Sequence, residues 1–478
     1  MALKTAEHYK HSLRQMNPVA YILGEKVANV SDHPLIKPQV EAVAQTYSLA
    51  HQAESMNLLV AKSKLTGGQV NRFTQLFENI ADLTAKVKMI RLCAQTTGTC
   101  FMRCTGLDAM NATAAITCEI DQKYGTNYHQ RVLKYIKYVQ ENDLAVYCGN
   151  SDVKGDRSLR PSEQPDPDMY LHIVDRTKDG IIVRGAKAHQ SGSLCAHEVL
   201  VLPDRDMRQN DKDYAVAFAL PNDTKGILNI YTRGPLEDRL LDGIDLGNVK
   251  FGKSCPLVIY DNVLVPWDRV FLCGEYEFTA PLLRMFASYH RHSHGGCKAG
   301  MGDVLIGAAA TIADYNGVPN ASHIRSKITD MVRMSEVMYG CCLAASTEAE
   351  RTASGVYFVN PVLANTSKLY EGINLPEMIR LLIDIAGGLV ATMPSEKDLD
   401  NAEVGHLVKK YLKGVADVST EDRMRMFRLI EYLGFQSRDV VSNIMGGGSP
   451  EAHKITLLRE TDLEAKKKLA KRLAGIEQ

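Results

Sequence analysis

Histidine and cysteine residues recur at short, regular spacings in two stretches that lie far apart in the chain. In SYHRHSHGGCKAGMGD, His290 and Cys297 are seven positions apart. In TGTCFMRCTG, Cys100 and Cys104 are four positions apart. On a helix both spacings place the paired side chains on one face, although the two glycines before Cys297 are residues that often end a helix. Each pair could therefore supply half of one metal site.

Three thiolates and one imidazole are suitable ligands for zinc or for an iron–sulfur cluster, and the residue types do not choose between the two. The alternative is that the cysteines are small core residues and that His290, His292 and His294 are ordinary helix positions. The residues alone leave both interpretations open.

The composition favours a cytoplasmic enzyme with a small-molecule substrate. Fifty-six basic residues balance fifty-six acidic ones, which gives no electrostatic reason to expect nucleic acid or an anionic membrane as a partner. The start of the chain lacks the apolar core of a signal peptide, and no apolar run reaches the length of a membrane span. Eleven cysteines, an odd number, indicate free thiols or metal ligands rather than a disulfide framework.

The periodicity changes twice along the 478 residues and predicts three modules. Apolar residues at threes and fours predict an N-terminal helical domain, residues 1–148. Alternating runs, with a hairpin across Asp179-Gly180, predict a middle β domain over residues 149–275, either a barrel or a sandwich. Helical periodicity returns in residues 276–478 and predicts a C-terminal bundle. The expected fold class is α+β.

A series of motifs spread over nearly the whole chain resembles one known family. The motifs are RCTGLDAMNA, EIDQKYGTNYHQR, KGDRSLRPSEQPDPD, GIIVRGAKAHQSGS, DNVLVPWDRVFLCGEY, YHRHSHGGCKAGMGD, DIAGGLVATMPSE and MGGGSPEAHKI. In order and spacing they are similar to the 4-hydroxybutyryl-CoA dehydratase/vinylacetyl-CoA isomerase family, which groups with the flavin-dependent 4-hydroxyphenylacetate 3-hydroxylases. The resemblance implies an acyl-CoA dehydrogenase-like fold, an acyl-CoA substrate and a homotetramer.

The resemblance also implies two cofactors. In that family three cysteines and one histidine hold a [4Fe-4S] cluster, and the matching residues here are Cys100, Cys104, His290 and Cys297. The related hydroxylases lack these cysteines. No G-x-G-x-x-G fingerprint follows a predicted strand, so the implied FAD is not expected in a Rossmann-type site. The residues implied to contact FAD, the last two in a neighbouring subunit, are Asp156, Arg157, His189, Gln190, Ser191, Gly387 and Gly388.

The reaction implied by the resemblance removes water from 4-hydroxybutyryl-CoA by one-electron chemistry, in anaerobic metabolism. A base takes the α-proton, the flavin takes and returns one electron, and cluster iron acts as a Lewis acid on the leaving hydroxyl. His290 is the implied ligand and candidate base. Lys298 matches a lysine of the family.

The chain departs from the family pattern at four positions. His294 stands where the family has a tyrosine, Cys255 and Ser442 stand where it has glutamates, and Met102 stands where it has a glutamine. His294 and Cys255 are therefore counted with the candidate catalytic residues. The departures allow two interpretations, the family's dehydratase or a divergent lyase or isomerase for another acyl-CoA. A flavin hydroxylase is a further alternative that the ligand set disfavours.

Overall fold

Helices form most of the first part of the chain. The computed structural model describes residues 3–232, 242–248, 250–435 and 437–476. The helices of the first part are α1 (Ala6–Arg14), α2 (Lys37–Leu49), α3 (Met56–Leu59), α4 (Ile80–Thr97), α5 (Cys104–Tyr124) and α6 (Tyr128–Glu141). A small antiparallel pair, β3 (Val60–Lys62) and β4 (Gln69–Asn71), lies between α3 and α4.

Local sequence signals set the ends of α4 and α5. The side chain of Asn79 accepts a hydrogen bond from the N–H of Asp82 at the start of α4. Gly98 ends α4 with φ 62° and Gly125 ends α5 with φ 67°. Side-chain caps and left-handed glycines satisfy the backbone groups that a helix end leaves unpaired. The short loop that carries Cys100 therefore lies between two well-defined helices.

Two open sheets form the middle of the chain. The larger has the strand order β2-β1-β10-β11-β7-β6 and the smaller has the order β12-β9-β8-β5, and neither closes into a barrel within the described residues. The predicted hairpin across Asp179-Gly180 is confirmed, because β6 and β7 pair antiparallel around it. The strands are β1 (Val19–Ile22), β2 (Glu25–Val27), β5 (Val146–Gly149), β6 (His172–Arg176), β7 (Gly180–Lys187), β8 (Glu198–Val201), β9 (Val216–Pro221), β10 (Ile227–Ile230), β11 (Leu257–Pro266) and β12 (Val270–Cys273).

Side chains of both sheets share one hydrophobic core, to which Val183 of β7 and Phe218 of β9 belong. The beginning of the chain joins this core as well, because β1 runs parallel to β10. Ala20 and Ile22 alternate into the core and are buried. The first part of the chain is therefore not purely helical, since burying this short alternating stretch favours a strand.

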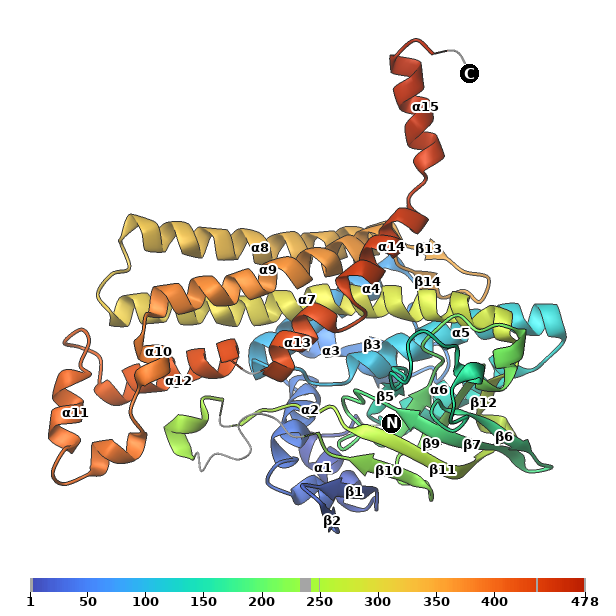
Figure 1. The fold of residues 1–478 in the computed structure, drawn as a ribbon, viewed down its shortest axis with the longest axis horizontal. Coiled ribbons are helices and arrows are strands. Elements are labelled where there is room, and N and C mark those ends of the chain that lie inside the picture. Colours follow the sequence, from blue (N-terminus) through green and yellow to red (C-terminus); the bar gives the residue numbers. More distant parts are fainter. Residues whose placement is uncertain (1–2, 233–241, 249, 436, 477–478) are drawn as a thin grey trace.

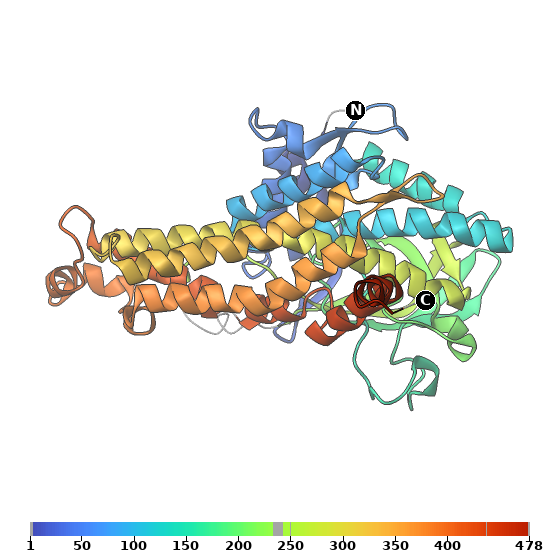
Figure 2. The ribbon, with the colours of Figure 1, turned by 90° about the horizontal axis from the view of Figure 1, so that it is seen from above.

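Three long helices lie side by side in the C-terminal part (Figures 1 and 2). Two helices of the first part, α4 and α5, pack on α7 and join the two helical regions. No helix in the described ranges is long and apolar enough to cross a membrane. The elements of this part are α7 (Thr279–Tyr315), α8 (Ser322–Thr347), β13 (Glu350–Arg351), β14 (Tyr357–Phe358), α9 (Pro361–Ala386), α10 (Leu389–Thr392), α11 (Gly405–Tyr411), α12 (Thr420–Phe435), α13 (Ser437–Met445), α14 (Pro450–Glu460) and α15 (Leu463–Leu473).

The long helix α7 continues through Gly295 and Gly296 for 37 residues. A Cβ atom on Gly296 would lie 2.7 Å from the carbonyl oxygen of Val87 on α4. The glycine therefore allows close approach of α4 rather than ending the helix. As a result His290 and Cys297 lie two turns apart on one continuous helix.

Candidate active site

The two stretches singled out for metal ligation meet where α5 begins beside α7. Cys104 is the first residue of α5, and His290 and Cys297 lie on α7. Cys100 lies in the loop before α5, in which Met102 adopts a left-handed conformation with φ 59°. The same-face argument is correct for His290 and Cys297 but wrong for Cys100 and Cys104, because the chain turns between those two.

The three thiols are close enough to act on one another electrostatically. Burial, reinforced by Cys100, raises the pKa of Cys104 well above its ordinary value. Burial also raises the pKa of Cys297 to about 12, against the opposing charge of Lys298. Buried thiols of this kind become thiolates when a metal binds. The chemistry of the donor set therefore fits a metal centre.

The arrangement differs from that of a single-ion site. Within the part of the chain that the structure describes, no three His, Cys, Asp or Glu side chains are grouped as they would be around one metal ion. A four-iron cluster distributes its protein ligands over different irons, so its ligands do not converge on one point.

Two neighbouring histidines on α7 are each held at Nδ1 by a carboxylate from another helix. His290 Nδ1 lies 3.1 Å from Asp108 Oδ2 of α5, and His294 Nδ1 lies 3.3 Å from Glu371 Oε1 of α9. The two imidazole centroids are 4.8 Å apart, edge to face. Both rings therefore lie along the helix face that carries Cys297, which is one turn beyond His294 and two turns beyond His290.

The two carboxylates belong to buried ion pairs. Lys86 Nζ lies 2.6 Å from Asp108 Oδ1, and Lys368 Nζ lies 3.0 Å from Glu371 Oε1, with all four side chains fully buried. Burial acts to raise the pKa of Glu371. The charge of Lys368 and the interaction with His294 outweigh this effect and lower the pKa to about 2. Burial lowers the pKa of His294 well below its ordinary value. The result is an ionised carboxylate beside a neutral imidazole.

Lys298 is a buried lysine that forms no ion pair within the described residues. It is 2% exposed, and its Nζ donates to Met301 Sδ at 3.2 Å. None of the described carboxylates lies within ion-pair distance of it. The positive charge of Lys298 lowers the pKa of Cys297 and so opposes the effect of burial, which means that its ammonium lies near that thiol. Its charge also helps to lower the pKa of Glu371, so these two buried groups lie near each other.

A glycine-rich loop, residues 446–448, lies against the two imidazoles. A Cβ atom on Gly446 would lie 2.9 Å from His294 Cε1, and one on Gly447 would lie 3.9 Å from His290 Cδ2. Arg291 Nε donates to the carbonyl oxygen of Gly447 at 2.9 Å and fixes the loop. The absence of side chains at these glycines therefore allows the loop to cover the histidines.

Backbone hydrogen bonds join the predicted flavin-contacting segment AHQSGS to two other stretches of the β region. The N–H of Ala188 donates to Ser151 O at 2.9 Å. The N–H of Gln190 donates to Pro256 O, also at 2.9 Å. The structure thereby places three stretches of the β region beside one another. The loop that carries Met102 lies next to them, because a Cβ atom on Gly192 would contact Met102.

The side chains of the AHQSGS segment differ in exposure. Gln190 is buried and its Oε1 has no hydrogen-bond partner in the described ranges. Ser191 Oγ lies 2.9 Å from Cys255 Sγ, whereas His189 is exposed. A buried acceptor without a partner is unfavourable and marks a position where a ligand donor fits, such as a ring N–H of a flavin.

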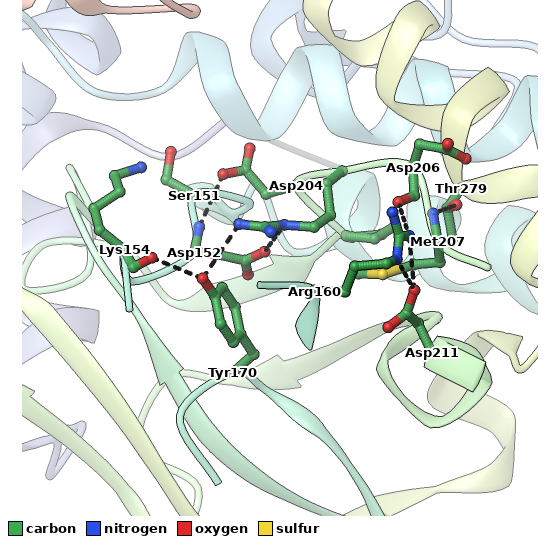
Figure 3. Close-up of polar contacts among 12 residues, drawn as sticks. Ser151, Asp152, Lys154, Arg160, Tyr170, Asp204, Asp206, Met207, Asp211 and Thr279 are labelled. Atoms are coloured by element: carbon green, nitrogen blue, oxygen red, sulfur yellow. Dashed lines mark hydrogen bonds and ion pairs between the residues drawn. The ribbon is translucent and has the colours of Figure 1, made fainter. Parts of the chain in front are cut away.

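The loop that carries Asp156 and Arg157 is anchored at both ends (Figure 3). Tyr170 Oη donates to Lys154 O at 2.8 Å. At the other end Arg160 Nε donates to a fully buried aspartate at 2.7 Å. Asp156 and Arg157 themselves are exposed. The anchors fix the path of the loop and leave its tip accessible to a ligand.

The predicted pair Gly387 and Gly388 lies elsewhere. Gly387 ends α9 with φ 82°, and both glycines are exposed with open space where a Cβ would be. At 1.5 Å per residue, Gly387 is about 24 Å along α9 from Glu371. Within one chain these glycines are not brought to the centre.

Both parts of the chain match models of one family. The 4-hydroxyphenylacetate 3-hydroxylase N-terminal model matches residues 5–272 and the C-terminal model matches residues 280–475. The 4-hydroxybutyryl-CoA dehydratase/vinylacetyl-CoA-Delta-isomerase of Clostridium aminobutyricum is 46% identical over 99% of this chain and 100% of its own length. This chain belongs to the 4-hydroxybutyryl-CoA dehydratase/vinylacetyl-CoA isomerase family.

Solved structures agree with that assignment. An oxygen-tolerant archaeal 4-hydroxybutyryl-CoA dehydratase from N. maritimus matches with a TM-score of 0.97 and 45% identity, over 100% of this chain and 96% of that one. The FAD complex of HpaB, the oxygenase component of 4-hydroxyphenylacetate 3-monooxygenase, matches with a TM-score of 0.87 and 25% identity over 98% of both chains. Glutaryl-CoA dehydrogenase shares the fold at a TM-score of 0.51 and 15% identity, over 83% of this chain and 81% of that one. The expected α+β, acyl-CoA dehydrogenase-like fold is confirmed.

The four positions singled out from the motifs as departures have defined contacts in the structure. Met102 Sδ is 3.9 Å from Cys195 Sγ, beside the Cys100 loop. Ser442 Oγ accepts a hydrogen bond from a lysine of the Cys255 segment at 2.9 Å. His294 contacts the imidazole of the implied ligand histidine. Cys255, the fourth position, contacts Ser191 through its Sγ.

Sequence reasoning missed the buried charges Lys86, Asp108, Lys368 and Glu371. The available signal was a charged residue within an apolar helical stretch, as in GLDAMNATAAI. Such residues are almost never fully buried unless they are paired. The pairing itself lay outside sequence reasoning, because Asp108 and its imidazole partner are 182 positions apart.

Proposed function

We propose that this chain dehydrates 4-hydroxybutyryl-CoA, or a related short hydroxyacyl-CoA, to an enoyl-CoA and also isomerises vinylacetyl-CoA. The full-length likeness to a dehydratase/isomerase carries this proposal. The proximity of the three thiols supports it, as does the placement of His290 on the helix of Cys297.

Two cofactors are part of the proposal. Cys100, Cys104, His290 and Cys297 would hold a [4Fe-4S] cluster, since the donor types and the buried thiols fit one. FAD would lie against the Gln190 segment, where a buried acceptor has no partner among the described residues. Its other proposed contacts are Asp156, Arg157, His189, Ser191, Gly387 and Gly388. When bound, the flavin would supply one-electron chemistry and the cluster a Lewis acid for the leaving hydroxyl.

The chain's own residues bind, orient and shield the substrate. His290 is proposed to accept the α-proton at Nε2 while that nitrogen is released from iron, and Lys298 would place a positive charge near the thioester oxygen as negative charge develops there. His294 and Cys255 would line the space around the acyl group. The glycine-rich loop over the imidazoles restricts access of water to them.

A divergent lyase or isomerase for another acyl-CoA is the second candidate. The observation that favours it is the edge-to-face contact between His294 and His290, which places one of the four departures beside a proposed ligand. His294, Cys255, Ser442 and Met102 differ in size and hydrogen bonding from the residues that they replace. Such changes alter substrate choice while leaving the proposed ligands in place.

Assembly and organisation follow the family. We propose a cytoplasmic homotetramer with domains at residues 1–148, 149–275 and 276–478, in which the two open sheets pack as a sandwich. Helix α15 projects from the body of the chain (Figure 1) and exposes Leu469 and Leu473 at 53% and 84%. Exposed leucines on a projecting helix are suited to contact another subunit.

Anaerobically purified protein with both cofactors is expected to convert 4-hydroxybutyryl-CoA or vinylacetyl-CoA to the conjugated enoyl-CoA without an external electron donor. Product formation followed by chromatography is the measurement. If neither ester reacts but solvent deuterium enters the α-position of another acyl-CoA, the divergent function is supported. NADH-linked oxygen consumption with a phenol would contradict both and indicate a hydroxylase.

His294→Tyr is expected to increase turnover of 4-hydroxybutyryl-CoA relative to other acyl-CoA esters. A phenol hydroxyl can donate a proton into the site, whereas Nδ1 of His294 is held by Glu371. The gain should lie within the about 10²-fold that one proton-transfer group contributes. Iron content serves as the control and should not change; its loss would identify His294 as the imidazole ligand.

A further inference from the structure

We infer that Asp108 is a positioning residue that fixes the tautomer of His290 and so leaves Nε2 free to bind iron. This inference rests on the proposed function. A carboxylate only accepts hydrogen bonds, so the contact of 3.1 Å between Asp108 Oδ2 and His290 Nδ1 requires the hydrogen on Nδ1. The lone pair then lies on Nε2, which hydrogen-bonds to no residue in the described ranges.

The surroundings of Asp108 fix its orientation. Lys86 Nζ lies 2.6 Å from Oδ1 and also donates to Tyr289 O at 2.9 Å. Ser293 Oγ lies 2.8 Å from Oδ2 and 3.0 Å from Oδ1. Each oxygen of the Asp108 carboxylate therefore has its own donor. Oδ1 accepts from the Lys86 ammonium, and Oδ2 accepts from the His290 ring. All of this lies in the interior, because Asp108 and Lys86 are both 0% exposed.

The position of Asp108 connects the two halves of the proposed ligand set. It follows Cys104 by one turn on α5, and its charge contributes to the raised pKa of that thiol. It meets His290, which approaches from α7. A carboxylate that orients a ligand histidine in this way affects metal affinity about 10–100-fold.

The isosteric change Asp108→Asn reverses the tautomer. Lys86 carries only donors, so the single amide oxygen must face it. The amide NH₂ then faces His290 Nδ1, which must accept, and the hydrogen moves to Nε2. His290 can no longer bind iron through Nε2, and the cluster retains only its three thiolates.

Iron and sulfide analysis with EPR spectroscopy after mild oxidation provides the test. Wild-type protein is expected to hold about four irons per chain. Asp108→Asn is expected to lose about one of them and to give the EPR signal of a three-iron cluster. The double variant Lys86→Met/Asp108→Asn should regain the wild-type iron content and spectrum, because without Lys86 the amide oxygen can turn to His290.

Two controls keep the test decisive. Glu371→Gln makes the same change at His294 and should leave iron content and spectrum as in the wild type. If Asp108→Asn does not fold, Lys86→Met/Asp108→Asn is compared with Lys86→Met/Asp108→Leu, which lacks any acceptor and should lose the fourth iron.

Three results would overturn the inference. They are an unchanged cluster in Asp108→Asn, equal clusters in the two double variants, and loss of iron in Glu371→Gln alone, which would make His294 the ligand. Wild-type protein without iron overturns the proposed function and the inference together, and is thus distinguished from the other outcomes.

Discussion

Cys104→Ala is expected to lose most of the about four irons per chain together with turnover. Cys104 begins α5 beside Cys100 and Cys297, and its removal takes away one of the three proposed thiolate ligands. Because only one sulfur atom is removed from the interior, folding should be affected little, by about 1 kcal/mol. Iron and sulfide analysis of anaerobic protein, with a thermal melt of the same sample, measures both effects.

Cys93→Ala is the matched control. Cys93 is fully buried on α4, and its thiol is close enough to Cys297 to share in the electrostatics there. It is not part of the proposed ligand set, so its removal should retain the iron. Full iron content in Cys104→Ala, or its loss in Cys93→Ala, would show that the ligand set is wrong.

Lys298→Met is expected to lower kcat about 10²–10³-fold, the cost of removing one charge that stabilises a developing anion. Its Nζ donates only to a thioether in the described residues, so no buried carboxylate is left unpaired by the change. Stability should therefore stay the same or rise, and KM should change little. Steady-state kinetics, urea unfolding and iron content are the three measurements.

Lys368→Met provides the contrast. Its ammonium forms the fully buried pair with Glu371, and removing one partner of such a pair costs about 3–5 kcal/mol. If Lys298→Met destabilised the protein as much as Lys368→Met, Lys298 would be a structural cation. Retained turnover in folded Lys298→Met would exclude the proposed role near the thioester oxygen.

The helices and strands could be predicted from the sequence because their signals are local. The hairpin across Asp179-Gly180 and the long apolar periodicity of α7 are properties of neighbouring residues. The motifs were sufficient for the family, since they cover nearly the whole chain in order. The seven-residue spacing of His290 and Cys297 was correct for the same reason, as it depends only on helix geometry.

The expectations that failed concern residues whose conformation depends on another element. The spacing of Cys100 and Cys104 was compatible with a helix, but the chain leaves α4 at Gly98 and turns before α5. Gly296 could have ended α7 and instead allows α4 to approach it. In both cases packing between helices outweighs the local preference.

The sequence by itself determined the element types, the family and the residue types of the proposed ligand set. Only the tertiary structure decided which buried charges face those residues, because Asp108 meets His290 across 182 positions and Glu371 meets His294 across 77. A charge is stable in the interior only when a partner from another element neutralises it or donates to it. That partner is fixed by how α5, α7 and α9 pack together, and residue spacing along one element carries no information about it.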